Sequence, residues 1–477
     1  MIGRKREIEA LRAAMNSEES EFVAVYGRRR IGKTYLINEF FGGGFAFQIS
    51  GIENSSRREQ LDLFRLTLKA RGRACPRLNS WLEAFFELEA YLSELPAGKK
   101  VVFIDELPWF DTPKSGFLVA FENFWNGWAA LRKDILLVIC GSATTWIINK
   151  VLRSRGGLYN RVTKRLPLAP FTLSECEEYA AYRGLGYSRL DLCEVYMAIG
   201  GVAYYWSRLE PGKTVAENFD AMFFGQSAEL RDEFRSLFSS TFRLSALHSE
   251  IIDLLSGGGR GMTREELRLG LKREVSGSLL TETFSELEEC GFIRGFGGYG
   301  KAKKEIVYQI VDHYILFYNR FLRDCHSGNE GFWSRNCRSP RLNNWRGLAF
   351  ERVCMTHVKE IKSALGIAGI AADAYSWIYR GSGPEDPGVQ IDLLLDRADN
   401  TVDICELKYS REQFVMTRDE ADKINRRAAV FLREAGRRKS VRVVMVTACG
   451  VKHGVNSGCY QAEVTLDDIF AGNLRKG

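Results

Sequence analysis

A short stretch near the N-terminus has the residue types and the spacing of a phosphate-binding loop. Residues 27–34 fit the pattern G-x-x-x-x-G-K-[ST] at every fixed position, between an apolar run typical of a strand and a segment typical of a helix. Gly27 and Gly32 leave room for backbone N–H groups to curl around phosphate oxygens. Lys33 can reach the β- and γ-phosphates, and Thr34 can bind Mg²⁺. The stretch therefore predicts binding of a nucleoside triphosphate, taken as ATP, together with Mg²⁺.

A second chemical signal is a run of four apolar β-formers that ends in two carboxylates, Val101–Glu106. Such a run is typical of an interior parallel strand, and the carboxyl end of that strand faces the ligand crevice of an α/β sheet. Downstream of a P-loop this is the Walker B pattern. Asp105 would hold the Mg²⁺, directly or through water, and Glu106 would polarise the attacking water as a general base.

The segments that follow resemble one known family. The Gly-Ser pair ending in Ser142, the motif Tyr159-x-Arg161 and the run 199–205 are similar to ATPases described mainly from archaea, of the AAA+/STAND type. The resemblance implies that Ser142 senses the γ-phosphate and that Arg161, or Arg155, neutralises phosphate charge. A turn serine and a solvated loop arginine stay open as alternatives. The residues predicted to bind the nucleotide are Gly27, Arg28, Arg30, Gly32, Lys33, Thr34, Tyr35, Asp105, Ser142 and Arg161.

The C-terminal part carries a third constellation, of acidic residues and one lysine. Asp392 and the pair Glu406-x-Lys408 interrupt strands that are otherwise apolar, and Glu351 lies on a predicted helix before them. Glu406 and Lys408 share one face of their strand. A hairpin centred on Asp399 places Asp392 opposite Glu406, so both carboxylates could grip one Mg²⁺. Glu351 would add an outer ligand, and Lys408 would orient or deprotonate the attacking water.

This order of residues, a helix Glu followed by Asp and then Glu-x-Lys, resembles the PD-(D/E)XK nuclease family. The resemblance implies Mg²⁺-dependent cleavage of DNA, although Gln390-Ile391, without a proline, precedes Asp392. The plain alternative is a solvent-facing Glu-x-Lys on an edge strand. Arg426 and Arg427 fit contacts with a phosphate backbone, but helical surfaces often carry such residues.

Four predicted domains would position the residues of these sites. We predict an α/β chain with a P-loop NTPase parallel sheet (1–165), a helical lid (166–235), a winged helix-turn-helix (236–327) and an α/β PD-(D/E)XK-like domain (335–477). The pattern Ser174-x-x-Glu177 predicts a capping box that opens a lid helix.

The predicted winged helix has mixed charges. Its third helix, 281–289, is acidic, which argues against tight binding in a major groove, while the wing residues Lys301, Lys303 and Lys304 could touch phosphates. A spacer between the ATPase and its effector is the slightly preferred interpretation.

Composition narrows the class of protein. The 477 residues carry a net charge of +7, which permits a nucleic-acid partner without requiring one. Eleven cysteines without a CxxC pair predict buried thiols in a reducing compartment, and the absence of a signal-type or membrane-spanning run predicts a cytoplasmic protein.

The expected partners are ATP and DNA, with oligomerisation left open. The expected function is an ATP-hydrolysing ATPase that regulates a fused nuclease-like domain. The alternative is an ATP-controlled DNA- or protein-binding switch with an inactive nuclease fold.

Overall fold

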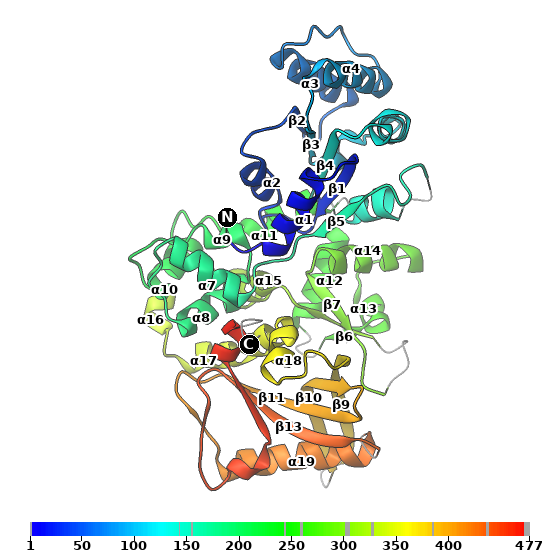
Figure 1. Cartoon of the computed structure of the whole chain (residues 1–477). Helices are drawn as coiled ribbons and strands as arrows, with labels where there is room; N and C mark the ends of the chain where they lie inside the picture. Colours follow the sequence, from blue (N-terminus) through cyan, green and yellow to red (C-terminus); the bar gives the residue numbers. More distant parts are fainter. Residues whose placement is uncertain are drawn as a thin grey trace. The chain divides into compact units, whose positions relative to one another are not determined.

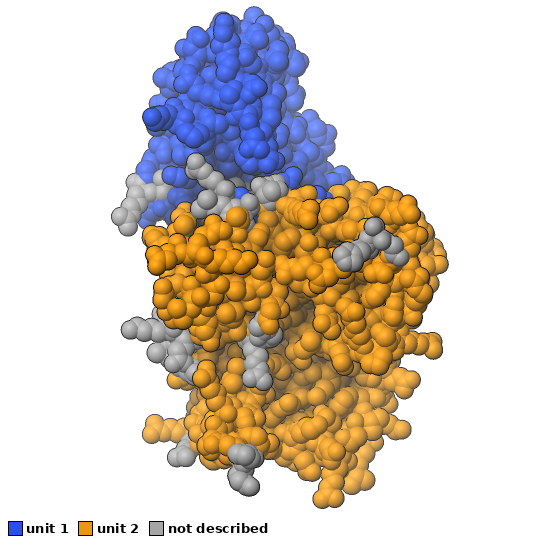
Figure 2. All heavy atoms as spheres, turned by 180° about the vertical axis from the view of Figure 1, so that it is seen from behind, with its two compact units in different colours: residues 1–169, 241–243 blue, residues 170–240, 244–477 orange. Residues whose placement is uncertain are grey.

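The computed structural model describes residues 2–142, 144–153, 156–242, 245–257, 261–300, 306–325, 329–383, 386–435 and 438–471. The chain forms two compact units, residues 1–169 with 241–243 and residues 170–240 with 244–477 (Figure 2). Arg155 and the wing residues Lys301, Lys303 and Lys304 lie outside the described residues. Within the described ranges, no helix has both the length and the apolar character needed to cross a bilayer.

The first unit is built on a five-stranded parallel sheet in the order β2-β3-β4-β1-β5 (Figure 1). β3 and β4 are buried along their whole length, as interior parallel strands between two helical layers must be. The prediction of an α/β fold with a parallel sheet is confirmed. The strands are β1 (Glu21–Tyr26), β2 (Phe47–Ser50), β3 (Lys100–Asp105), β4 (Ile135–Gly141) and β5 (Lys164–Pro167).

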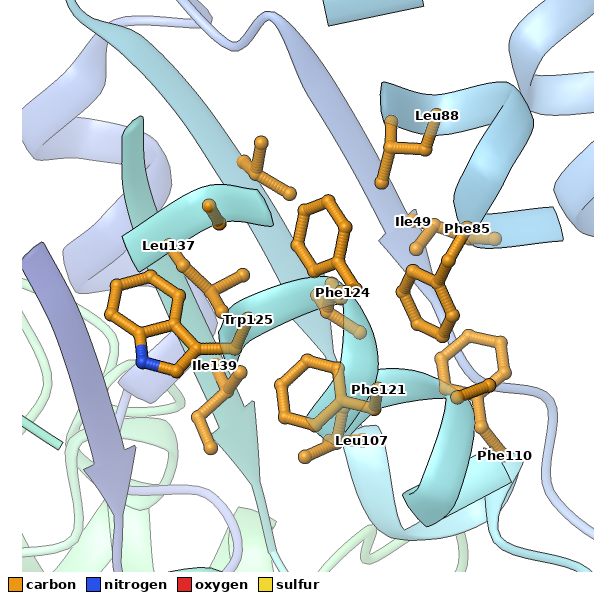
Figure 3. Packing of buried hydrophobic residues seen from close by; sticks show 14 of the residues in the cluster. Ile49, Phe85, Leu88, Leu107, Phe110, Phe121, Phe124, Trp125, Leu137 and Ile139 are labelled. Carbon is orange, nitrogen blue, oxygen red and sulfur yellow. The ribbon is translucent and has the colours of Figure 1, made fainter. Parts of the chain in front are cut away.

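Successive residues of these strands face two different hydrophobic cores. In β4, Val138 packs in the core formed with the N-terminal helices, and Leu137 and Ile139 pack in the other. This second core is rich in aromatic rings, among them Phe85 and Phe121 (Figure 3). The helices and helical turns of the unit are α1 (Lys5–Met15), α2 (Lys33–Phe41), α3 (Arg57–Ala70), α4 (Trp81–Glu94), η1 (Leu107–Phe110), α5 (Phe117–Asn123), η2 (Phe124–Trp128), η3 (Ala129–Leu131), α6 (Thr144–Ile147) and η4 (Ile148–Leu152).

The second unit begins with the helices that the sequence assigns to a lid. The first of them starts earlier than predicted: Thr172 is its N-cap and forms a capping box with Glu175, so the predicted box at Ser174 and Glu177 is wrong. The two patterns overlap, and the earlier one forms because the buried Leu173 joins the first turn of the helix. These helices are α7 (Leu173–Tyr182), α8 (Arg189–Ile199), α9 (Ala203–Trp206), α10 (Val215–Phe219), η5 (Asp220–Phe224) and α11 (Glu233–Thr241).

Three helices and a small antiparallel sheet follow in the chain, with strand order β6-β8-β7. These are the elements expected of the predicted winged helix, which stays a prediction. The elements are α12 (Ser245–Gly257), β6 (Met262–Thr263), α13 (Arg264–Gly270), α14 (Gly277–Glu289), β7 (Ile293–Phe296), β8 (Val307–Ile310), α15 (His313–Phe317) and η6 (Tyr318–Leu322).

The hairpin between β7 and β8 packs on the C-terminal sheet. Gly298 forms a β-bridge with Ser376, and the N–H of Tyr299 donates to the carbonyl of Ser376 at 3.3 Å. The Tyr299 ring lies 5.8 Å from the Tyr375 ring and 5.2 Å from the Phe431 ring. The described part of the hairpin is thus engaged within the chain, which favours the spacer interpretation over a wing that touches DNA.

The C-terminal part contains a mixed five-stranded sheet in the order β15-β13-β11-β10-β9. β9, β10 and β11 are antiparallel neighbours, whereas β11, β13 and β15 run parallel. The strands are β9 (Ala372–Gly383), β10 (Asp386–Arg397), β11 (Thr401–Lys408), β12 (Phe414–Val415), β13 (Ser440–Thr447), β14 (Val451–Lys452) and β15 (Ala462–Thr465). The helices are α16 (Phe332–Asn336), α17 (Pro340–Thr356), α18 (Val358–Ala364), α19 (Arg418–Glu434), η7 (Ser457–Cys459) and α20 (Leu466–Ala471).

Two buried polar contacts join the α7–α8 region to the C-terminal part of the same unit. The backbone N–H of Leu173 donates to Nε2 of His357 at 3.1 Å, so a histidine ring satisfies one of the open N–H groups at the start of α7. Glu194 of α8 accepts Nη2 of Arg346 at 2.7 Å, and both side chains are almost fully buried. Arg411, three residues beyond Lys408, donates to the second carboxylate oxygen at 3.2 Å.

Candidate functional site

The phosphate-binding loop connects the end of β1 to the start of α2. Gly27 (φ 145°) and Gly32 (φ 88°) both have positive φ values, as the sequence predicts for glycines that turn a loop tightly. A Cβ on Gly27 would lie 2.3 Å from the carbonyl oxygen of Leu168, so only glycine fits there. Arg30 also has a positive φ, 69°, which is unusual for a residue with a side chain. The backbone of the loop is therefore fixed in the unusual shape that a phosphate cradle needs.

The lysine and the threonine of the motif are held by neighbouring groups. The side chain of Lys33 is 5% exposed, and its ammonium donates to the carbonyls of Gly27 at 2.9 Å and Arg28 at 2.8 Å. An ammonium has three donors, so one remains for a phosphate oxygen. The Thr34 hydroxyl donates to Oδ2 of Asp105 at 2.9 Å. The threonine and the Walker B aspartate therefore meet, although 71 residues separate them in the sequence.

Asp105 ends β3 and is buried. Burial raises the pKa of this carboxyl, and the neighbouring Glu106 adds to the effect, against the lowering influence of the Thr34 hydroxyl. A hydroxyl and a carboxylate side by side are oxygen donors of the kind that Mg²⁺ prefers, and a cation would remove the penalty for ionising Asp105. The residues present therefore fit Mg²⁺ at this position.

The glutamate of the Walker B pair is tied to Ser142. Both the backbone N–H and the hydroxyl of Ser142 donate to Oε2 of Glu106, at 3.1 and 2.9 Å. Glu106 has a φ of 46°, a backbone conformation that costs a non-glycine residue about 1–3 kcal/mol. The ends of β3 and β4 thus bring together the predicted base and the predicted sensor.

The remaining residues predicted to bind nucleotide differ in environment. Arg28 is buried, whereas Tyr35, on the first turn of α2, is largely exposed. Arg161 is exposed and lies in the turn at 157–161, so its role in sensing phosphate stays a prediction.

The C-terminal constellation has the predicted strand register. Leu393 pairs with Cys405, which sets Asp392 and Glu406 as the next positions of the same ladder. β11 lies between β10 and β13, so the alternative that Glu406 and Lys408 stand on an edge strand is wrong. β10 also pairs with β9, and the register of that pair shifts between Ile391 and Leu394. Asp392 lies within this irregular part of the strand.

The carboxylates of this constellation are not gathered into one metal-binding group. Nη1 of Arg427, on α19, lies 2.5 Å from each oxygen of the buried Glu406, and Lys408 lies 3.1 Å from one of them. Lys408 also pairs with Glu420 at 3.1 Å. Within the described ranges, no three His, Cys, Asp or Glu side chains lie close enough to hold a metal ion. The carboxylates of Glu351, Asp392 and Glu406 are suitable ligands for Mg²⁺. At Glu406, however, the guanidinium of Arg427 occupies the position that a cation would take.

Arg427 is the residue whose position sequence reasoning missed. The sequence left open whether Arg426 and Arg427 contact a phosphate backbone or only cover a helix surface, but Arg427 contacts Glu406 and Arg426 donates to the carbonyl of Pro387. Helical spacing could have indicated the first contact, because Glu420 and Arg427 are seven residues apart and so share the face of α19 that meets Glu406 and Lys408.

Glu351 has a different environment. It lies on α17, and burial together with the nearby charge of Asp392 raises the pKa of its carboxyl to about 7. Glu351 and Asp392 line one cavity, and Glu406 is not among the residues that line it.

Comparisons with known proteins give a family match in the N-terminal part and more distant similarities over longer stretches of the chain. Residues 1–209 match a family described as an ATPase domain predominantly from Archaea. Over 424 residues, the chain is 24% identical to an uncharacterized protein of Methanocaldococcus jannaschii, MJECL04, a match that spans 86% of this chain and 87% of the relative. A second protein of that organism, the uncharacterized ATP-binding protein MJ0423, is 44% identical over 39 residues, 8% of this chain and 66% of the relative.

Among solved structures, the Walker-type ATPase PABY2304 of Pyrococcus abyssi matches with a TM-score of 0.48 and 16% identity, over 67% of this chain and 96% of that one. The ORC2 protein of Aeropyrum pernix matches with a TM-score of 0.41 and 14% identity, over 67% of this chain and 93% of that one. The family match and the geometry of the phosphate-binding loop agree. The N-terminal part of the chain is a P-loop ATPase domain of the type found predominantly in Archaea.

Proposed function

We propose that the chain hydrolyses ATP with Mg²⁺ and that the nucleotide state regulates its C-terminal nuclease-like part. The observation that carries the hydrolytic proposal is the meeting of two pairs, Thr34 with Asp105 and Glu106 with Ser142, beside a complete phosphate-binding loop. A Mg²⁺ ion bound there would neutralise charge on the phosphates.

Each side chain has a separate task in this proposal. Lys33 donates its remaining N–H to a phosphate oxygen, and the loop amides bind the phosphates. Glu106 accepts a proton from the attacking water, and the two donors of Ser142 fix the position of its carboxylate. Because the serine binds the base directly, a change at the γ-phosphate that moves Ser142 would also move Glu106.

Nucleotide binding and hydrolysis can be tested separately. Lys33→Ala should lose ATP binding and keep its fold, whereas Lys133→Ala, at an exposed lysine of the same unit, should bind ATP normally. Glu106→Gln should bind ATP with kcat lowered about 100-fold or more. Normal ATP binding by Lys33→Ala would show that the loop assignment is wrong.

The second part of the proposal is Mg²⁺-dependent cleavage of DNA at Asp392, Glu406 and Lys408. The central position of β11 and the register of β10 on β11 support it. Plasmid and single-stranded DNA should be cut in Mg²⁺ by the native chain and by Lys452→Ala, an exposed lysine of β14, but not by Lys408→Ala. A change in cleavage upon addition of ATP would show that the two parts are coupled.

A non-enzymatic switch is the second candidate function. The contact of Arg427 with both oxygens of Glu406, and the packing of the β7–β8 hairpin on β9, favour a C-terminal part that responds to ATP without cutting DNA. Titration of Mn²⁺ into the nucleotide-free full chain distinguishes the two candidates. Binding that Asp392→Ala abolishes supports the nuclease, and no binding supports the switch.

A further inference from the structure

A cavity of about 740 Å³ lies within the second unit, beside the proposed nuclease site. The residues that line it come from the helices α8, α12, α15, η6 and α17 and from the strands β8, β9 and β10. Two of the three proposed metal ligands, Glu351 and Asp392, line it. A reacting phosphate at these carboxylates would therefore place the neighbouring part of the same substrate in the cavity.

The lining combines the three kinds of group that a nucleotide needs. Arg320, Arg323 and Arg352 supply positive charge for phosphates. Arg323 pairs with Asp253 and Arg352 bonds to Gln309, so the acidic and amide neighbours fix these guanidinium groups.

Apolar side chains also line the cavity. Trp345 contributes an aromatic ring, and Leu348 and Ile378, which are 64% and 40% exposed, contribute apolar side chains that a ligand can reach. Aromatic and apolar surfaces of this kind bind the faces of unpaired bases, because every base offers a π-face.

Among the described residues, the side-chain oxygen of Asn319 is a polar atom of the lining that accepts no hydrogen bond. Nδ2 of Asn319 donates to the Ser256 hydroxyl at 2.5 Å, and that hydroxyl donates to the carbonyl of Ile252 at 2.6 Å. The hydroxyl proton is thus already used, which fixes the orientation of the amide. Oδ1 of Asn319 is buried and accepts no hydrogen bond from the described residues. A buried acceptor without a hydrogen bond costs free energy. A ligand that donates to Oδ1 of Asn319, such as the exocyclic amino group of a base, would therefore be bound favourably there.

We infer that this cavity binds an unpaired nucleotide of a single-stranded nucleic acid, with its phosphate directed to Glu351 and Asp392. A cavity of this size admits one or two nucleotides and no base-paired segment. Enzymes that act on a nucleotide inside a cavity must take it from a single strand or flip it out of a duplex, at a cost of a few kcal/mol. The inference rests on the proposed nuclease function and names its substrate: single strands and unpaired ends, in preference to blunt duplex.

The test is binding, measured apart from cleavage. The anisotropy of a fluorescein-labelled 12-nucleotide single-stranded DNA, its RNA counterpart and a blunt DNA hairpin is followed with the full chain in Ca²⁺. The variant Leu348→Asp places a carboxylate in the cavity at a side chain that is already exposed. Leu432→Asp, at a half-exposed leucine of α19 that does not line the cavity, is the matched control.

The single strand is expected to bind the native chain about tenfold or more tightly than the hairpin, a difference of the size given by stacking of one or two bases. Leu348→Asp should lose about tenfold of that affinity, and Leu432→Asp should keep it within about twofold. Preference for the RNA or the DNA strand identifies which of the two the cavity takes.

Equal binding of hairpin and single strand, or equal affinity of the two aspartate variants, would overturn the inference. A failure of the nuclease proposal has a different signature. In that case the native chain cleaves nothing in Mg²⁺, whatever its binding preference.

Discussion

Replacing Arg427 tests whether its side chain competes with a metal ion for the carboxylate of Glu406. Its guanidinium lies 2.5 Å from both oxygens of Glu406, so a metal ion that uses this carboxylate must displace it. A hydrogen bond to a charged group contributes about 1.5–3 kcal/mol. Since each 1.4 kcal/mol changes an equilibrium constant tenfold, Arg427→Gln should bind Mn²⁺ about 10- to 100-fold more tightly than the native chain.

The adjacent arginine provides the control. Arg426 also lies on α19, but it donates to the carbonyl of Pro387, so Arg426→Gln should leave the affinity for Mn²⁺ unchanged. Calorimetric titration of the nucleotide-free full chain measures both variants. An unchanged or weaker affinity in Arg427→Gln would refute the reasoning, because Arg427 would then not compete with the cation.

Three further predictions concern the loop and the buried contacts. Gly27→Ala should abolish ATP binding, since its Cβ would lie 2.3 Å from a carbonyl oxygen, while Gly42→Ala, with nothing within 4 Å, should retain it; fluorescent-nucleotide binding measures both. Glu194→Ala should lower the free energy of unfolding by about 3–5 kcal/mol, because it leaves the Arg346 guanidinium buried without its carboxylate. Urea denaturation followed by tryptophan fluorescence measures this, and a loss below about 1 kcal/mol would contradict it. Burial lowers the pKa of His357, so its contribution to stability is complete above the unfolded value of about 6.5 and is lost as pH falls below it. Thermal unfolding between pH 8 and 5 should show that loss, and His357→Gln should reduce it.

The sequence predicted the tight turn of the phosphate-binding loop and the side-by-side placement of Thr34 and Asp105, because these signals are local. The fixed spacing of Gly27, Gly32, Lys33 and Thr34 determines the loop, and an apolar strand that ends in carboxylates determines where Asp105 lies. The register of the C-terminal hairpin was predictable for the same reason, since a short turn fixes which residues face each other.

What could not be predicted depends on contacts between distant segments. Helical spacing places Arg427 on the same face of α19 as Glu420, but the sequence does not show that this face packs against Glu406 and covers both its oxygens. The overlap of two capping patterns at Thr172 and Ser174 is resolved by burial of Leu173, which is a tertiary effect. The cavity beside Glu351 is lined by residues of five separate helices and three strands, and no single stretch of sequence carries its signal.

The bridge between Gly298 and Ser376 has a consequence for solubility. β9 is the outermost strand of the C-terminal sheet, and an uncovered outermost strand offers its open N–H and C=O groups to strands of other molecules. The β7–β8 hairpin occupies part of that strand with its own backbone and adds the ring of Tyr299. A fragment beginning at residue 335 would lack this cover, so self-association through β9 is expected of the fragment and not of the full chain.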